Sequence, residues 1–536
     1  MAALTPLLVF LAVLAVRSVY WAALEATPLS EWHLWRETDE WGFLDWSSRL
    51  AAGNWMDRPA WRAYFSWQVP GGPAPAWEAR YQPNAYFTGP LYAYGLALLR
   101  AAFGSPIVSA RLLQLLLAAA TAAALAAATA KVLRRRAGNV VAVAGALFAG
   151  LMDGLYAPSV FHDGFLYRDG PVGHVGTLLM VMPLLASGSW GALAAGLLGG
   201  FGALLKQTLL PLGIVAAALV WRRAPAGADR GRALVFAGAG LAVPLLAMAL
   251  RNVAVGVPPL TFDTRQATSF VWGNVRGADA TTVPPARMPA VLDEAKGSTL
   301  KAFQLVLASY RDAPLEYPRL LAKKLVTFFG GFEVPDDASL YFFRDRLPVL
   351  PMLPVYTYLL GPGIVGLCAA LARGILRRGE ALLALVAFLV PLGSSLMVQT
   401  VSRYRVAVSG PLALGAGLLL GICLDDLLRA RVGRAAALAA GSLFLSGVTL
   451  LPSVIPAGRH RWVDTVVYAT LVERHVSPQA AAGEVARYLE EGRDDPQRAL
   501  GLIATRRWWN GDRSGVRLEP QGVASPGRRF APPKER

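Results

Sequence analysis

The sequence predicts an all-α protein that crosses the membrane many times. Of its 536 residues, 55% are hydrophobic and 16% are charged. Mean hydropathy is +0.42. Apolar stretches of about 17 to 25 residues, the length that a helix needs to cross a bilayer, recur along the chain. The two cysteines and five histidines are scattered, which favours neither a disulfide framework nor a zinc cluster.

Eleven segments are expected to span the membrane. They cover residues 5–24, 106–130, 139–157, 171–188, 190–206, 208–221, 233–250, 351–372, 381–400, 408–424 and 435–452. The first segment has no basic amino-terminal region and no small-residue cleavage site. We therefore expect it to be a retained anchor rather than a signal peptide.

Basic residues cluster in four of the connections between these segments. The clusters are Lys131 with Arg134–Arg136, Arg222–Arg232, Arg373–Arg378, and Arg429–Arg434. All four lie on one side if the eleven spans are right, and the positive-inside rule makes that side cytoplasmic. Topology and contact with membrane lipids therefore explain the net charge of +17 better than nucleic acid does.

This topology puts nearly all of the loop mass on the extracytoplasmic side. Two large loops, 25–105 and 251–350, lie there, and so does the end of the chain. The sequence thus divides into a transmembrane module, 1–452, and a small charged extracytoplasmic tail, 453–536. Apolar stretches near 90–103 and 320–329 suit helices that lie in the membrane interface.

The first large loop carries two adjacent carboxylates in a tryptophan-rich setting. Eight of the fifteen tryptophans fall between residues 25 and 89, and indoles favour the bilayer interface. Thr38 can cap a helix that runs to Leu50. Asp39 and Glu40 then lie in the first turn of that helix, at the membrane surface. This position suits chemistry on a membrane-bound substrate.

Few charges interrupt the apolar segments, and all of them fall toward the outer half of the membrane. They are Arg17, Arg111 and Lys206, with Arg403 and Arg405 directly after the ninth segment. Ionisable groups at membrane depth are energetically unfavourable and indicate function. A lipid-linked phosphate is a natural partner, because arginine matches phosphate oxygens with two donors and lysine adds a point charge.

Several motifs resemble those of the GT-C glycosyltransferases, in particular bacterial relatives of the protein O-mannosyltransferases and the lipid A aminoarabinose transferase. The motifs are Thr38-Asp39-Glu40 with the Gly53-Asn54 turn, Gly89-Pro90-Leu91-Tyr92, Gly104 with Arg111, Leu204-Leu205-Lys206, and Ser402-Arg403-Tyr404-Arg405. Their order and sidedness over about residues 1–425 agree with the family. One departure is Gly89, which stands where the aminoarabinose transferases have a lysine, so that phosphate contact is not carried over.

The resemblance implies a GT-C-like bundle in a bacterial inner membrane. It also implies transfer of a sugar, with inversion, from a polyprenyl-phosphate donor to a hydroxyl of a glycan, lipid or protein acceptor at the outer face. Asp39 is then the catalytic base, and Lys206, Arg403 and Arg405 bind the donor phosphate. An extended backbone would aim both arginines to one face.

Glu40, Asp163 and Asp169 are the supporting acids that the family resemblance implies. In the family, acids near 163–169 contact the donor or a divalent metal, so a divalent metal stays open as a cofactor.

Each of these residues also has a structural interpretation. Acids in a first helical turn stabilise the helix dipole, and Asp-Gly pairs such as those at 163 and 169 are common in turns. Arginines and lysines at span ends anchor helices at the interface.

Two other functions match parts of the pattern. A glycan polymerase or ligase that uses a lipid pyrophosphate also needs outer cations, but not the early Asp-Glu pair. A transporter places charged or broken segments near the midplane, often in two repeated halves, and the sequence shows neither feature.

Overall fold

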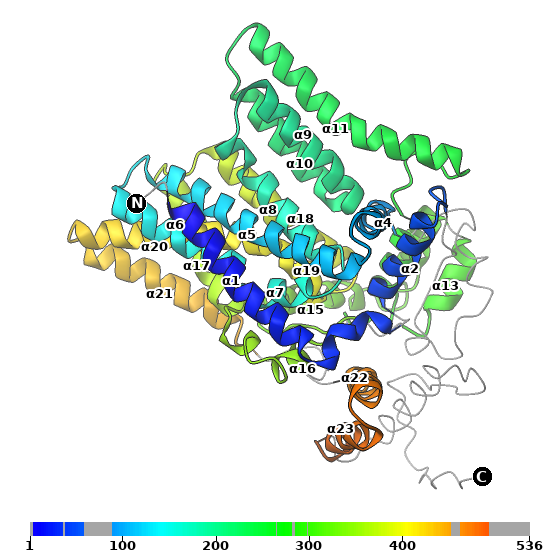
Figure 1. Ribbon diagram of the computed structural model, residues 1–536. Helices are drawn as coiled ribbons and strands as arrows, with labels where there is room; N and C mark the ends of the chain where they lie inside the picture. The colour runs from blue at the N-terminus through cyan, green and yellow to red at the C-terminus, as the bar shows by residue number, and fades with distance from the viewer. Residues whose placement is uncertain are drawn as a thin grey trace, which may run out of the picture.

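The computed structural model describes residues 4–35, 38–57, 88–263, 265–280, 285–296, 298–451 and 461–491. Over these residues the chain forms helices and no strand. Long apolar helices make a bundle, and the short helices of the loops and tail gather beside one end of it (Figure 1). Trp61, Trp67 and Trp77, and the tail residues 453–460 and 492–536, lie outside the described residues.

Each of the eleven expected spans coincides with a helix. These are α1 (Thr5–Glu25), α5 (Pro106–Leu133), α6 (Asn139–Gly154), α8 (Asp169–Leu185), α9 (Gly188–Leu205), α10 (Leu210–Arg222), α11 (Ala228–Ala254), α17 (Tyr356–Ala372), α18 (Arg378–Met397), α20 (Ser409–Leu428) and α21 (Val432–Val448). In the described part of the chain, seven helices are long and apolar enough to cross a membrane, and α6 with the bent α7 (Ala157–Asp163) makes an eighth. The all-helical membrane fold is confirmed, whereas the count of eleven spans stays a prediction.

Glycines let the central helices approach one another closely. A methyl group on Gly366 of α17 would lie 1.8 Å from the carbonyl oxygen of Gly415 in α20. On another side of α20, a methyl group on Gly145 of α6 would lie 2.6 Å from the carbonyl oxygen of Gly417. Such contacts between small residues hold helices together in a membrane, where lipid tails are as apolar as the side chains. They place α20 in the middle of the bundle.

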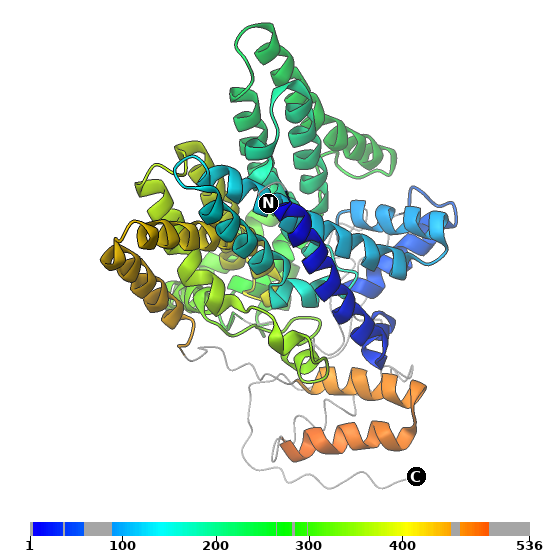
Figure 2. The same ribbon diagram turned by 60° about the vertical axis from the view of Figure 1, so that its left-hand side comes forward.

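Helices α9, α10 and α11 form an arm that leans away from this central bundle (Figures 1 and 2). Small residues pack the arm as well, since a methyl group on Gly196 of α9 would lie 2.3 Å from the carbonyl oxygen of Ala237 in α11. Helix α10 contacts α8 and α18 of the central bundle. Because α9 ends at Leu205 and α10 begins at Leu210, the short helix η2 (Gln207–Leu209) lies at the junction of arm and bundle.

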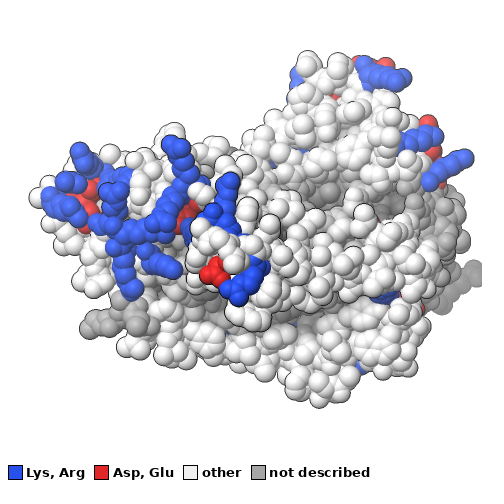
Figure 3. Space-filling view, turned by 90° about the horizontal axis from the view of Figure 1, so that it is seen from above, with Lys and Arg blue, Asp and Glu red and all other residues white. Residues whose placement is uncertain are grey.

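The basic connections meet at one end of the bundle. Glu380, in the first turn of α18, accepts hydrogen bonds from Arg135 at 2.7 and 2.8 Å and from Arg223 at 2.6 Å. Arg373, at the end of α17, pairs with Asp426 of α20 at 2.6 Å. Figure 3 shows lysines and arginines gathered at the end where the α20–α21 turn lies in Figure 1. This is the arrangement that the predicted cytoplasmic side requires.

Short helices from both large loops gather beside the other end. The first loop forms η1 (Pro28–Leu34), α2 (Asp39–Ala51) and α4 (Leu91–Phe103), and the second forms α12 (Arg265–Asn274), α13 (Met288–Ala295), α14 (Thr299–Ala308), α15 (Glu316–Phe329), α16 (Leu340–Arg344) and η3 (Leu350–Met352). Further short elements are α19 (Ser402–Arg405) and η4 (Val406–Val408), and the tail contains α22 (Trp462–His475) and α23 (Pro478–Glu491). The helices expected after Thr38, near 90–103 and near 320–329 are all present.

The described part of the tail packs on both large loops. The backbone N–H of Ser339 donates to Asp464 Oδ1 at 3.2 Å, and Arg346 pairs with Glu484 at 2.8 Å. Apolar side chains of α22, such as Val467, are buried in one cluster with Trp32 of the first loop. The tail therefore lies at the same end of the molecule as the loops.

This arrangement predicts the outcome of labelling from the two sides of the membrane. In a background without Cys368 and Cys423, single cysteines at the exposed positions Asn54 and Gln479 should react with an impermeant maleimide added from outside. A cysteine at the exposed Arg431 should react only after the membrane is opened. Protection of position 479 together with labelling of position 54 would show that the spans are miscounted.

Candidate functional site

The first functional side chains are placed by the start of α2. Thr38 Oγ1 accepts a hydrogen bond from the backbone N–H of Trp41 at 3.1 Å, which is the expected amino-terminal cap. Asp39 and Glu40 are thereby fixed in the first turn and point about 100° apart. Asp39 points toward Arg403, whereas Glu40 points toward the loop that precedes α8.

Arg403 lies among four carboxylates that come from three parts of the chain. Its Nη1 atom lies 2.9 Å from Asp39 Oδ2 and 3.8 Å from Asp169 Oδ2. The same nitrogen lies 3.9 Å from Asp337 Oδ2, and Nε lies 2.5 Å from Asp336 Oδ2. Only 4% of Arg403 is exposed. A buried guanidinium needs such compensation, because removing an unpaired charge from water is strongly unfavourable.

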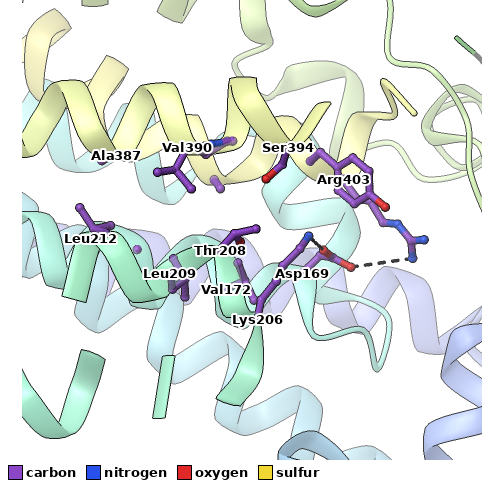
Figure 4. A pocket seen from close by; sticks show the side chains of 14 residues that line it. Asp169, Val172, Lys206, Thr208, Leu209, Leu212, Ala387, Val390, Ser394 and Arg403 are labelled. Atoms are coloured by element: carbon purple, nitrogen blue, oxygen red, sulfur yellow. Dashed lines mark hydrogen bonds and ion pairs between the residues drawn. The ribbon is translucent and has the colours of Figure 1, made fainter. Parts of the chain in front are cut away.

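Lys206 is the second cation of this site. Helix α9 ends at Leu205, and Lys206 follows it in an extended backbone conformation. Its ammonium lies 2.8 Å from Asp169 Oδ1 and 4.3 Å from the centre of the Tyr404 ring. Asp169 thus bridges Lys206 and Arg403, as the dashed lines of Figure 4 show.

A small, partly open groove lies between α8, α10 and α18, next to these two cations. Its polar end is formed by Asp169, Lys206, Arg403 and Tyr404. Its walls are mostly apolar and include Val172, Leu209, Leu212, Ala387, Val390 and Pro391, with Thr208 and Ser394 between the two ends (Figure 4). The lining therefore combines cations that would suit an anionic head with apolar walls that would suit the start of a hydrocarbon chain.

Sequence reasoning missed two acids of this site, Asp336 and Asp337. The backbone N–H of Asp39 donates to Asp337 Oδ2 at 3.2 Å, so Asp337 helps to hold the start of α2. Burial raises the pKa of Asp337 well above its usual value, and the negative charges of Asp39 and Asp336 raise it further. Two adjacent acids in the second large loop were the available signal. Asp337 lies 298 positions from Asp39, too far for any local pattern to connect the two.

The expectation that Arg405 shares a face with Arg403 is wrong. Residues 402–405 form a helical turn rather than an extended strand, and in a helix two positions apart means opposite sides. Arg405 turns to Glu333, at 2.6 Å, and donates to the carbonyl oxygen of Phe332 at 2.8 Å. Its guanidinium is buried there and does not line the groove.

Asp163 also lies apart from the groove. It forms an ion pair with Arg17 of α1 and lies 2.8 Å from His174 Nε2 of α8. Arg17 additionally donates to the carbonyl oxygen of Gly154 at 2.7 Å, where α6 ends at the bend into α7. The structure therefore brings together Asp39, Asp169, Lys206 and Arg403 of the predicted residues, and places Asp163 and Arg405 elsewhere.

Glu40 is a buried acid that is held by the backbone of the loop before α8. Its Oε1 atom accepts from the N–H of Leu166 at 3.0 Å, and its Oε2 atom is buried. Burial raises the pKa of Glu40 to about 7, and the positive charge of Arg111 opposes this shift. Glu40 is thus positioned to hold the loop before Asp169 rather than to contact the groove.

The acids do not converge as metal ligands do. In the ranges that the structure describes, no group of three or more His, Cys, Asp or Glu side chains is arranged to hold a metal ion. The four carboxylates around Arg403 face the guanidinium instead. The divalent metal that the family resemblance left open therefore stays a prediction.

Solved structures of an oligosaccharyltransferase from Archaeoglobus fulgidus resemble this chain. The apo form has a TM-score of 0.42 and 11% identity over 89% of this chain and 59% of that one. The complex with Zn and sulfate has a TM-score of 0.34 and 14% identity, covering 83% and 57%. The form tethered with an acceptor peptide containing the NVT sequon has a TM-score of 0.27 and 13% identity, covering 83% and 59%.

The chain spans about three fifths of the length of that archaeal protein. No protein-family model and no curated protein matches the chain.

The buried Glu40 predicts a pH-dependent difference in stability. Its pKa of about 7 in the folded protein exceeds the usual value of 4.5, so the folded state keeps the proton to a higher pH than the unfolded state does. The folded state therefore loses stability as the pH rises from about 4.5 to about 7. Glu40→Gln keeps an acceptor for Leu166 without the charge. It should be about 1 to 3 kcal/mol more stable than wild type at pH 8 and about equal at pH 4.5. The measurement is thermal unfolding in detergent across this pH range.

The control is Glu294→Gln, because Glu294 is 61% exposed in its side chain. This variant should show no pH-dependent difference. A Glu40→Gln variant that is less stable than wild type at pH 8 would mean that the carboxylate form is required.

Proposed function

We propose that this protein is a membrane glycosyltransferase of the GT-C type. It would transfer a sugar from a polyprenyl-phosphate donor to an acceptor hydroxyl at the extracytoplasmic face of a bacterial inner membrane. The observation that carries the proposal is the groove, which has Lys206 and Arg403 at one end and apolar walls beyond them. Arg403 joins this groove to Asp39, the carboxylate at the start of α2.

The chemistry assigns a role to each of these side chains. The acceptor oxygen attacks the anomeric carbon, and the bond from that carbon to the phosphate oxygen breaks. The lipid phosphate leaves with the electron pair, and the hydroxyl proton passes to Asp39 as general base. Lys206 and Arg403 stabilise the charge that grows on the departing phosphate. A single displacement of this kind inverts the anomeric carbon.

Arg403 connects the two halves of this reaction. Its Nη1 atom is bound to Asp39 at 2.9 Å, and arginine binds phosphate oxygens with the same donors. A phosphate that binds this nitrogen competes with Asp39 and frees the carboxylate to accept a proton. Asp169, between Lys206 and Arg403, then holds the two cations at the spacing that the phosphate meets.

The groove favours this donor over the pyrophosphate of a polymerase or ligase. Lys206 and Arg403 are the only cations that line it within the described residues, and a pyrophosphate carries more charge to compensate. The site also lies where loops and span ends meet, whereas a transporter binds its substrate near the midplane. Residues 1–452 thus form the proposed catalytic module, and α22 of the tail supports the loop that carries Asp336 and Asp337.

The test of the proposed base is Asp39→Asn. The amide keeps the shape of the side chain but accepts no proton, so transfer should fall by about 10²–10⁴ while the affinity for the donor is kept or increased. The assay uses purified protein, a panel of polyprenyl-phosphate hexoses and pentoses, and lipid, glycan and peptide acceptors.

The matched control is Asp45→Asn, because Asp45 lies on the same helix and pairs with Arg49 at the surface. It should transfer as wild type does. Near-normal turnover in Asp39→Asn would assign the base to another residue, with Asp337 the nearest candidate. Absence of turnover from the wild type with every donor, together with no lipid-phosphate binding, would overturn the proposed function.

The groove itself predicts how affinity depends on the lipid chain. Val390 lines the wall on α18, and the neighbouring Leu389 is 47% exposed and lies outside the groove. Val390→Phe should weaken binding of a long polyprenyl phosphate by about tenfold. The larger ring would fill part of the groove, and the lipid chain would lose a buried contact worth roughly 1.5 kcal/mol. Binding of inorganic phosphate should be unchanged, and Leu389→Phe should change neither value. Wild-type affinity for the long polyprenyl phosphate in both variants would place the lipid chain outside the groove.

A further inference from the structure

A buried lysine of the second large loop caps the end of α18. Lys324, on α15, donates to the carbonyl oxygens of Leu396 at 2.8 Å and Val398 at 2.5 Å, and to Asn274 Oδ1 at 3.0 Å. The last four carbonyls of a helix lack partners within the helix, and a cation there is favoured by the helix dipole. Three acceptors match the three donors of an ammonium group. Lys324 is fully buried, and burial lowers its pKa to about 7.

Asn274 completes this cap from the neighbouring helix α12. Its side-chain amide donates to the carbonyl oxygen of Met397 at 2.7 Å, the carbonyl that Lys324 leaves free. A methyl group on Gly273 would lie 2.4 Å from the carbonyl oxygen of Val398, so the backbones of α12 and the end of α18 are in direct contact. Three consecutive carbonyls, from 396 to 398, are therefore held by the second large loop.

Arg405 caps α15 in the opposite direction. It follows α18 by eight residues in the chain and donates to the carbonyl oxygen of Phe328 at 3.2 Å and to that of Gly330. These carbonyls belong to the last turn of α15 and to the residue that ends it. Lys324 of α15 thus caps α18, and Arg405 beyond α18 caps α15, so each segment supplies the cation for the other's carboxyl end.

Arg403 lies inside the segment that this reciprocal cap encloses. Residues 398–405 are held at one end by Lys324 and Asn274 and at the other by Arg405. Between them, the backbone N–H of Ser402 donates to the carbonyl oxygen of Val334 at 3.0 Å. A shift of α15 would therefore move the guanidinium of Arg403 and, through α18, the groove wall that carries Ser394 and Val390.

We propose that Lys324, Asn274 and Arg405 are positioning residues that fix Arg403 at the head of the groove. This inference rests on the proposed function, because it assigns Arg403 to the donor phosphate. None of these three residues lines the groove, and burying a polar or charged side chain without partners is unfavourable. A positioning role explains why a lysine, an asparagine and an arginine are buried here. It also gives the second large loop a part in donor binding.

The test compares Lys324→Met with Lys323→Met. Lys323 is the preceding residue on α15 and is partly exposed, so the control changes the same charge on the same helix. Asn274→Ala is a milder second variant, which removes one donor from the cap if Lys324→Met does not fold. Two quantities are measured on the full-length protein in detergent: hydrogen–deuterium exchange of peptides that cover 396–406, and the dissociation constant of farnesyl phosphate.

Lys324→Met and Asn274→Ala should speed amide exchange over 396–406 and weaken farnesyl phosphate binding by tenfold or more, with Lys323→Met unchanged in both. Unchanged exchange in both variants would show that the cap does not hold the segment. Faster exchange with wild-type affinity would show that it holds the segment without positioning Arg403. In either case the proposed function would stand. A wild type that binds no farnesyl phosphate would overturn the donor assignment and this inference with it, while the exchange data would still report on the cap.

Discussion

The burial of one guanidinium organises the functional end of this protein. Arg403 is almost completely enclosed, and a charge so enclosed is tolerated only when opposite charges meet it with good geometry. The carboxylates that do so come from α2, from the start of α8 and from the loop before α16. These parts lie up to 364 positions from Arg403 in the chain. Pairing this one side chain therefore brings both large loops against the ends of the long apolar helices.

Interruptions of the long helices supply the side chains of the site. The bend between α6 and α7 leads to Asp169, the break between α9 and α10 presents Lys206, and the break after α18 presents Arg403. Non-helical backbone at this depth is tolerated only where protein or water satisfies its polar groups. The structure meets that requirement with side chains, such as Arg17 on the carbonyl of Gly154 and Lys324 on the end of α18. The same breaks in the long helices thus supply the side chains of the site and the carbonyl groups that neighbouring side chains must cap.

Local patterns in the sequence predicted what local physics determines. The apolar stretches predicted the eleven helices that coincide with the expected spans, and Thr38 predicted the start of α2. The isolated charges Lys206 and Arg403 indicated the residues at the polar end of the groove. Asp336, Asp337 and Lys324 were missed because their partners are remote in the chain. Arg405 was predicted on the wrong face because residues 402–405 are helical and Arg405 caps α15. No residue near Arg405 in the sequence indicates that contact.

The charge balance of the site has a consequence for the order of binding. Four carboxylates surround two cations, and the raised pKa of Asp337 removes part of this excess, because the protonated form carries no charge. Under the proposed function, the donor phosphate must still compete with Asp39 for Arg403. Until it does, Asp39 is occupied by the guanidinium and is a poor acceptor for a proton. Binding of the donor therefore prepares the base. An acceptor that arrives first meets a carboxylate that is still paired with Arg403. This favours an order in which the lipid phosphate binds before the acceptor hydroxyl.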